Sequence, residues 1–140
     1  MNKLYLLNAS VVVSTLMSVC FTLDAQTVKN ANFQTLAHFK SDGTIQNSQY
    51  KTIGYVKPDG TVQDASYRTV CYLKGNGTVQ DSRYRTMGYI KKDGTIQDSS
   101  YRTIGHIKDD GTVQDASYRT IGYAKGIPLQ LAAFYFFFTD

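Results

Sequence analysis

Residues 93–109 read Asp-Gly-Thr-Ile-Gln-Asp-Ser-Ser-Tyr-Arg-Thr-Ile-Gly-His-Ile-Lys-Asp, and the same phrase starts again at Asp110-Gly111-Thr112. Its glycine recurs every 17 residues, at Gly43, Gly60, Gly77, Gly94 and Gly111. A fixed period of this length indicates one supersecondary unit copied along the chain. Counting a degenerate first copy without Asp-Gly, six copies begin at Ala25, Asp42, Asp59, Asn76, Asp93 and Asp110.

The composition predicts an all-β chain. The 140 residues include no Glu and no Trp but 11 Tyr, and every copy is rich in Thr, Ile or Val. β-branched and aromatic side chains favour strands, whereas good helix formers are scarce here. With 42% hydrophobic residues, the chain has enough apolar material to form a core.

Each copy predicts a β-hairpin of two short strands, such as residues 84–91 and 95–98. Residues 92–94 lie between these strands as a three-residue loop. In the equivalent loop Pro58 suits the first turn position, and Gly60 suits the left-handed position of a type I turn with a G1 bulge. We therefore interpret the five repeated glycines as turn residues rather than as ligand contacts.

The other connection within the repeat has no Gly and opens with Asp, as in Asp64-Ala65-Ser66-Tyr67. A short carboxylate can accept the backbone N–H groups of such a turn, so we assign this Asp to turn chemistry rather than to catalysis. A small residue recurs in the middle of the longer strand, where Gly usually marks a close approach of the backbone. This position holds Ala37, Gly54, Cys71, Gly88, Gly105 and Gly122. It suggests strands that converge on an axis.

The two ends of the repeat region favour a closed ring. Residues 27–31 form a first short strand without a partner, and residues 118–125 form a last long strand without one. Pairing these two strands would remove both exposed edges. We therefore prefer a radial, flower- or propeller-like arrangement, with an open hairpin solenoid as the alternative.

Residues 126–140 break the period with a run of apolar and aromatic side chains that follows the repeat domain of residues 26–125. So much apolar surface is an aggregation hazard if it stays in solvent. We expect a final strand that packs on or into the repeat domain. A surface or assembly contact is the alternative.

Residues 1–25 predict a secretory signal peptide. Lys3 gives a positive start, residues 4–21 are uncharged and mostly apolar, and Ala25 is a small residue at the cut. Polar interruptions argue against a stable membrane span, so we expect export to the periplasm, the cell surface or the medium. Lipidation at Cys20 is less favoured, because Val19 does not fit a lipobox. Cleavage would leave Cys71 without a disulfide partner, and we expect it to be a buried hydrophobic residue.

The repeated Asp-Gly-Thr and Tyr-Arg-Thr-Ile-Gly-Tyr phrases, the signal peptide and the Ala-Ala-Phe tail together resemble the four-fold beta flower proteins, small secreted proteins of Bacteroides-type bacteria. The resemblance covers the chain from Gln26 onward. It implies a radial β architecture and no established activity. A ring of four petals would use some of the six copies differently or leave them outside.

The sequence offers no distinguished catalytic site. Glu is absent, and the only imidazoles, His38 and His106, each occupy a Tyr position of the repeat. The Cys and His spacing does not suit zinc, and the Asp-Gly loops lack the acidic oxygens of calcium loops. We expect no enzymatic activity, metal or cofactor. Although the net charge is +4, the basic residues are dispersed, which argues against a nucleic-acid partner.

Two aromatic ladders run through the copies. The first ladder is Phe33, Tyr50, Tyr67, Tyr84, Tyr101 and Tyr118, and the second is His38, Tyr55, Tyr72, Tyr89, His106 and Tyr123. Exposed Tyr rings can stack on sugars while polar neighbours donate hydrogen bonds. The alternative is packing between hairpins.

We expect an exported, non-enzymatic repeat protein, a structural or binding module at the cell envelope or outside it. Binding of a glycan or cell-wall polymer through the Tyr ladders is the alternative. The candidate binding residues, all from the second ladder, are Tyr55, Tyr72, Tyr89, His106 and Tyr123. A contiguous exposed row of these rings would favour glycan binding, and burial between hairpins would argue against it.

Overall fold

The computed structural model describes residues 26–139, which form twelve strands and one helix. The predicted signal peptide, with Cys20, lies outside the described residues. The strands are β1 (Gln26–Asn30), β2 (Thr35–Phe39), β3 (Thr44–Asn47), β4 (Thr52–Val56), β5 (Thr61–Asp64), β6 (Thr69–Leu73), β7 (Thr78–Asp81), β8 (Thr86–Ile90), β9 (Thr95–Asp98), β10 (Thr103–Ile107), β11 (Thr112–Asp115) and β12 (Thr120–Tyr123). Helix α1 (Leu129–Phe137) follows them.

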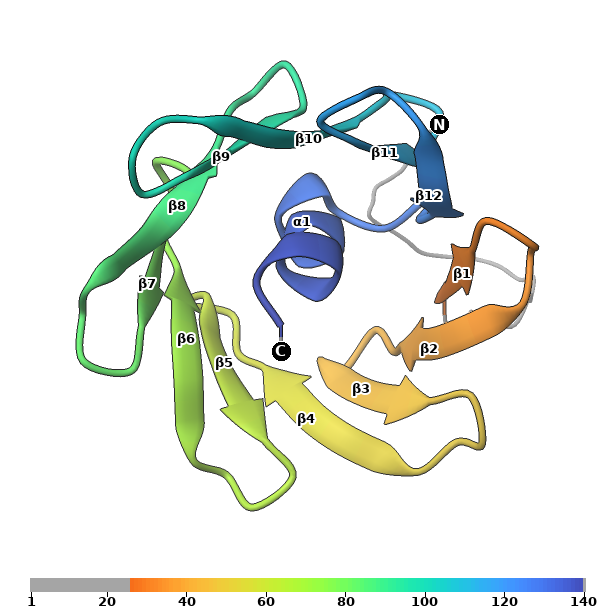
Figure 1. Cartoon of the computed structure of the whole chain (residues 1–140). Helices are drawn as coiled ribbons and strands as arrows, with labels where there is room; N and C mark the ends of the chain where they lie inside the picture. The colour runs from red at the N-terminus through yellow and green to blue at the C-terminus, as the bar shows by residue number, and fades with distance from the viewer. Residues whose placement is uncertain (1–25, 140) are drawn as a thin grey trace, which may run out of the picture.

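All twelve strands pair antiparallel with their sequence neighbours, and β1 pairs with β12 to close the ring. In that closing pair Lys29 lies opposite Tyr123 and Asn30 opposite Gly122. The ring therefore contains six hairpins, each called a petal here, from β1–β2 to β11–β12. Figure 1 shows the petals arranged around α1. The all-β hairpin repeat and the closed ring are confirmed, and the open solenoid is wrong.

Two kinds of loop alternate around the ring. Tip loops join the two strands of one petal, at residues 31–34, 48–51, 65–68, 82–85, 99–102 and 116–119. Junction loops join neighbouring petals, at residues 40–43, 57–60, 74–77, 91–94 and 108–111. Within every petal the pairing register shifts once, and such bulges increase the local twist of a hairpin.

The junction loops have the predicted turn. Gly60 has φ +91°, its N–H donates to the Lys57 carbonyl at 2.9 Å, and the Lys57 N–H donates to the Thr61 carbonyl at 2.8 Å. The other four repeated glycines have φ between +92° and +93°. Their role as turn residues follows from this left-handed backbone, which glycine adopts without steric penalty.

The core follows the alternation of the strands. Each four-residue short strand buries the apolar residue at its second position, and the long strands β6, β8 and β10 bury their third and fifth residues. The six residues from the short strands, counting Val28 of β1, are Val28, Ile45, Val62, Val79, Ile96 and Val113. They form one apolar cluster with α1. The alternation therefore brings every petal to a common centre.

The expected final strand is wrong, because residues 129–137 form a helix in the middle of the ring (Figure 1). Closure of the ring leaves no strand edge inside with which another strand could pair, whereas a helix satisfies its own backbone groups. Leu129, Gln130 and Leu131 are also good helix formers. Ala132, Ala133 and Phe134 are buried, so the tail packs into the repeat domain.

The small residue in the middle of the long strands β8, β10 and β12 makes room for the helix. A Cβ atom at Gly88 would meet the ring of Phe138, and one at Gly122 would meet the ring of Phe136. Gly105 stands in the same relation to Phe137. The interpretation that this position marks convergence on an axis is therefore confirmed.

Candidate functional site: the aromatic pairs of the rim

In each tip loop one side chain accepts the backbone hydrogen bonds that hold the turn. In the loop after β5, Asp64 Oδ1 accepts the backbone N–H groups of Ser66 at 2.8 Å and Arg68 at 3.0 Å. The Tyr67 N–H donates to the Asp64 carbonyl at 3.0 Å. Equivalent bonds form at Asp81, Asp98 and Asp115, and Asn30 and Asn47 replace Asp in the first two petals. The assignment of these Asp residues to turn chemistry is confirmed.

These bonds hold the next aromatic residue in the left-handed region of backbone space. The φ angles of the first ladder are +64° at Phe33, +67° at Tyr50, +68° at Tyr67, +69° at Tyr84, +67° at Tyr101 and +67° at Tyr118. For a residue with a Cβ this conformation costs about 1–2 kcal/mol. The sequence predicts the Asp turn but not this feature, because Tyr is not a residue that favours positive φ.

Each first-ladder ring stacks on a second-ladder ring of a neighbouring petal. The centroids of the six pairs are 4.3–4.7 Å apart and the ring planes lie within 6–12° of each other. The pairs are Phe33–Tyr123, His38–Tyr50, Tyr55–Tyr67, Tyr72–Tyr84, Tyr89–Tyr101 and His106–Tyr118. The first of them joins the two petals at which the ring closes. Packing between hairpins is therefore present at every junction.

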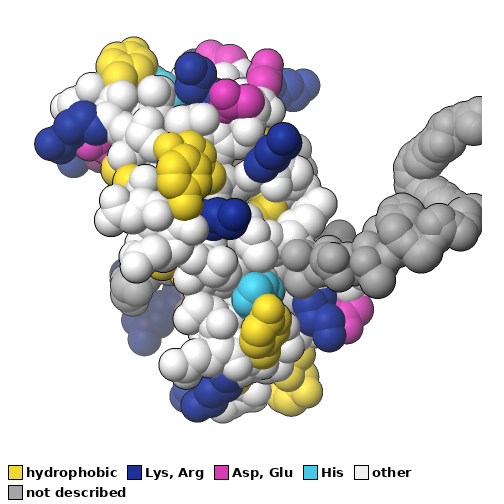
Figure 2. Space-filling view, turned by 90° about the vertical axis from the view of Figure 1, so that its right-hand side faces the viewer, with side chains coloured by type: hydrophobic (Ala, Val, Ile, Leu, Met, Phe, Trp, Pro, Cys, Tyr) yellow, Lys and Arg dark blue, Asp and Glu magenta, His cyan; other side chains and the backbone are white. Residues whose placement is uncertain are grey.

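The two members of a pair differ in exposure. First-ladder side chains remain 64–66% exposed, whereas the second-ladder rings are half-buried and His38 is buried. A ring that is stacked on one side and still exposed to this extent has its other face in solvent. We call the surface formed by the six tip loops and their aromatic pairs the rim. Figure 2 shows hydrophobic side chains that are separated from one another on this surface, with charged side chains between them.

Tyr55, Tyr72, Tyr89, His106 and Tyr123 therefore do not form the contiguous exposed row that glycan binding through the second ladder requires. They lie beneath the first-ladder rings and support them. The exposed ring faces belong to the first ladder, so the first-ladder residues replace the second-ladder residues as the candidate site. Positive φ values distinguish the first-ladder residues from the second-ladder residues. The sequence does not show this difference, because it arises only in the folded loop.

A family model described as 5-fold beta-flower protein matches residues 2–74 and residues 25–139. The chain belongs to this family. Comparison with curated proteins and with solved structures finds no match. The resemblance to beta flowers is thus confirmed in kind. The number of petals, which the sequence leaves open, is six, rather than the four of the resembled proteins or the five in the description of the matching family: all six copies lie in the ring.

Hydrogen bonds link the pairs of this beta flower further. The hydroxyl groups of Tyr55 and Tyr67 are 3.2 Å apart, and the Tyr72–Tyr84 and Tyr89–Tyr101 pairs have the same contact. The bond to the partner hydroxyl, followed by desolvation, raises the pKa of Tyr55 above its ordinary value. The raised pKa keeps the Tyr55 phenol neutral at physiological pH.

Charged groups flank the exposed rings. The Nε–H of Arg68 donates to Asp64 Oδ2 at 3.0 Å, and the same ion pair recurs in the next three petals at 2.9 Å. Backbone N–H groups, above all that of Arg68, lower the pKa of Asp64 below its ordinary value. Each of these tip loops thus presents an open aromatic face and, on the following residue, a guanidinium group oriented by its ion pair with Asp.

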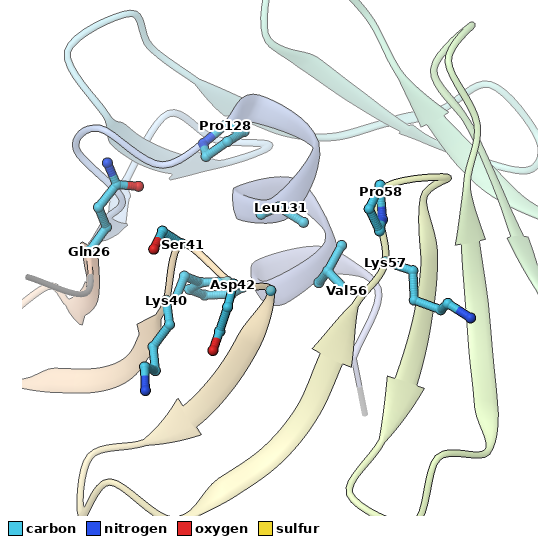
Figure 3. Close-up of a pocket in the computed structure, with 11 residues that line it drawn as sticks. Gln26, Lys40, Ser41, Asp42, Val56, Lys57, Pro58, Pro128 and Leu131 are labelled. Atoms are coloured by element: carbon cyan, nitrogen blue, oxygen red, sulfur yellow. The ribbon is translucent and has the colours of Figure 1, made fainter. Parts of the chain in front are cut away.

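A second candidate is a cavity of about 420 Å³ beside the start of α1. Figure 3 shows Val56, Pro58, Pro128 and Leu131 around it, while the Lys57 side chain extends away from the helix. Small-molecule sites have roughly this volume. Polar Gln26, Ser41 and Asp42 also line the cavity, but it lies in a sector that the helix leaves incompletely filled and away from the aromatic pairs.

The described residues contain no group of three His, Cys or acidic side chains that could hold a metal ion. Burial raises the pKa of the Cys71 thiol to about 12, so its thiolate is not available at neutral pH. Cys71 is a buried small side chain, as we expected. The rim therefore remains the candidate site of the flower.

Proposed function

We propose that this beta flower is an exported, non-enzymatic binding module that binds glycans through the exposed faces of its first-ladder rings. One observation carries the proposal. Six aromatic side chains are held at an unfavourable backbone conformation, with one face supported by a neighbouring petal and the other open. Strained backbone that recurs at one position is a reason to look for function there.

Sugar rings suit this arrangement. Their C–H faces stack on aromatic rings, and their hydroxyl groups need nearby donors and acceptors. The rim has such groups in the Tyr hydroxyls, the Ser side chains of the tip loops and the Arg side chains. Because each ring is already stacked, little side-chain freedom remains to be lost when a sugar binds.

A purely structural role for the pairs is the alternative. Stacked aromatic pairs contribute about 0.5–1.5 kcal/mol beyond the area that they bury, and they join neighbouring petals. Stacking explains why an aromatic side chain recurs at the left-handed position in all six petals, but it uses only one face of each ring and leaves the other face open. Binding and support of the ring are also compatible in one side chain.

The proposed location rests on residues 1–25, with Lys3, the apolar run and Ala25 as the features of a cleaved signal. Within residues 26–139 no helix has the length and apolar character needed to cross a membrane. Lipidation at Cys20 remains the second possibility. Detection of the unprocessed Met1 form in the cytoplasm would count against export.

A polysaccharide pull-down tests the binding proposal. The informative variant is Tyr67→Asn, Tyr84→Asn and Tyr101→Asn together, because Asn removes the ring and still tolerates positive φ. We expect the wild-type chain to be retained by at least one of a panel of neutral and acidic glycans, and the variant to be lost. Lys92→Ala, an exposed change in a junction loop, is the matched control. If the folded triple variant is retained by the polysaccharides as well as the wild type is, the proposal is wrong.

A further inference from the structure

The six tip loops are not equivalent in charge. In the petals β5–β6, β7–β8, β9–β10 and β11–β12, each first-ladder Tyr is followed by Arg and preceded by the Asp that caps the turn. We call these four loops the arginine arc, with Arg68, Arg85, Arg102 and Arg119. The petals β1–β2 and β3–β4 have Asn in place of Asp, and Gln34 or Lys51 in place of Arg. The arc is therefore a continuous stretch of four petals.

Within the arc the carboxylate is fully engaged and the guanidinium is not. Asp98 Oδ1 accepts two backbone N–H groups, and Oδ2 accepts the Nε–H of Arg102 at 2.9 Å. The Nη groups of Arg102 have no hydrogen bond to any residue between 26 and 139, and the side chain is 79% exposed. The ion pair orients the guanidinium and leaves its terminal donors open to solvent.

An open pair of Nη donors recognises a carboxylate best, because the planar guanidinium can form two parallel hydrogen bonds to it. The adjacent Tyr101 ring offers its free face to a sugar ring. A sugar that carries a carboxylate satisfies both groups at once. Uronic acids have this combination, whereas a neutral sugar uses only the aromatic face.

Repetition of the site points to a polymer. Four copies on consecutive petals can hold several residues of one chain, and linked weak contacts raise the overall affinity by about 10²–10⁴-fold. We propose that the arginine arc binds a linear polymer of uronic acids, an inference that rests on the proposed glycan-binding function. The petals β1–β2 and β3–β4 contribute no arginine to this binding.

Affinity measurements with polygalacturonate and with neutral dextran test the inference. The variant is Arg→Gln at positions 68, 85, 102 and 119, which keeps a polar side chain and removes the guanidinium group with its open donors. The matched control is Lys→Gln at positions 40, 57, 91 and 108, which removes the same charge from exposed positions of the junction loops. Thermal unfolding checks that both variants fold. We expect both to do so, since exposed ion pairs contribute at most about 1 kcal/mol each to stability.

We expect the arginine variant to bind polygalacturonate at least about 100-fold more weakly, as loss of multivalency requires, and the lysine control to bind as the wild type does. Arg→Lys at the four positions should also weaken binding, because Lys keeps the charge without the paired donors. Equal losses in the arginine and lysine variants would show unspecific charge attraction and overturn the inference.

Failure of this inference can be told apart from failure of the proposed function. Retention of dextran that depends on the first-ladder Tyr residues, with no preference for polygalacturonate, overturns the acidic ligand alone. Absence of retention by every glycan overturns both. Preference for polygalacturonate that disappears only in the arginine variant supports both.

Discussion

Gly75 and Gly77 lie in one junction loop and differ in what the backbone demands of them. Gly77 has φ +93°, and a Cβ atom there would meet the carbonyl of Ile90. Gly75 has ordinary φ and open space around the position of a Cβ. The turn requires glycine at position 77. It does not require glycine at position 75, because the equivalent position in other copies is occupied by Pro58, Lys92 or Asp109.

The two positions give a matched pair of variants. Gly77→Ala should lower the free energy of unfolding by at least about 1 kcal/mol, because it places a Cβ in the left-handed region and against a backbone carbonyl. Gly75→Ala should be neutral or stabilise the protein by up to about 1 kcal/mol, because it restricts the unfolded chain. Urea unfolding measures both. Equal effects would contradict the assigned role of Gly77.

At the scale of the element, the tip loop depends on one acceptor. Asp64, Asp81, Asp98 and Asp115 have lowered pKa values, caused first by the backbone N–H of the following Arg. A lowered pKa means that the folded state favours the charged carboxylate. Asn30 and Asn47 accept the same two backbone bonds without a charge.

This comparison predicts a pH dependence. The stabilisation from the four carboxylates is complete above the pKa of an unfolded Asp, at about 4, and is lost as the pH falls through the lower folded value. Replacing all four Asp by Asn should flatten the change in Tm below about pH 4 and lower Tm at neutral pH, because Asn keeps the backbone bonds but loses the charge that supplies this stabilisation. Calorimetric scans at several pH values measure this effect. A variant with the same acid sensitivity as the wild type would exclude the tip loops as its source.

At the scale of the whole molecule, one asymmetric helix fills a ring of six similar petals. Rings of Phe136, Phe137 and Phe138 lie against the small residues of β12, β10 and β8, but nothing from α1 is among the nearest atoms at Gly54. Ile53 of the same strand is 40% exposed. The helix thus favours one side of the ring, and the cavity lies on the other.

Removal of the helix should abolish the ring. A chain that ends after Lys125 loses Phe134 and exposes the inward residues of all six petals. Loss of one buried Phe costs about 3–5 kcal/mol, against a total stability of about 5–15 kcal/mol for a typical domain. We expect no cooperative transition in circular dichroism. A chain that ends after Phe138 is the control and should unfold as the full chain does.

The sequence pattern predicts what the period and local turn chemistry determine. Gly60 with Pro58 identifies the junction turn, and the unpaired terminal strands identify closure. The pattern does not predict the left-handed Tyr67, because the stacked ring of Tyr55 in the preceding petal accounts for it and this contact exists only in the folded ring. Nor does it predict α1, since the aromatic run at 134–138 resembles a strand until closure of the ring removes every available edge.

The pairing of β1 with β12 also bears on how such a gene can change. Both ends of the ring are ordinary strands of the repeat, so a duplication or deletion of one 17-residue unit leaves the same two ends to pair. Every turn and every aromatic contact would be rebuilt at the new junction. The central helix has no second copy, and it must be remodelled whenever the circumference changes. Petal number can therefore evolve only as fast as this one segment adapts to it.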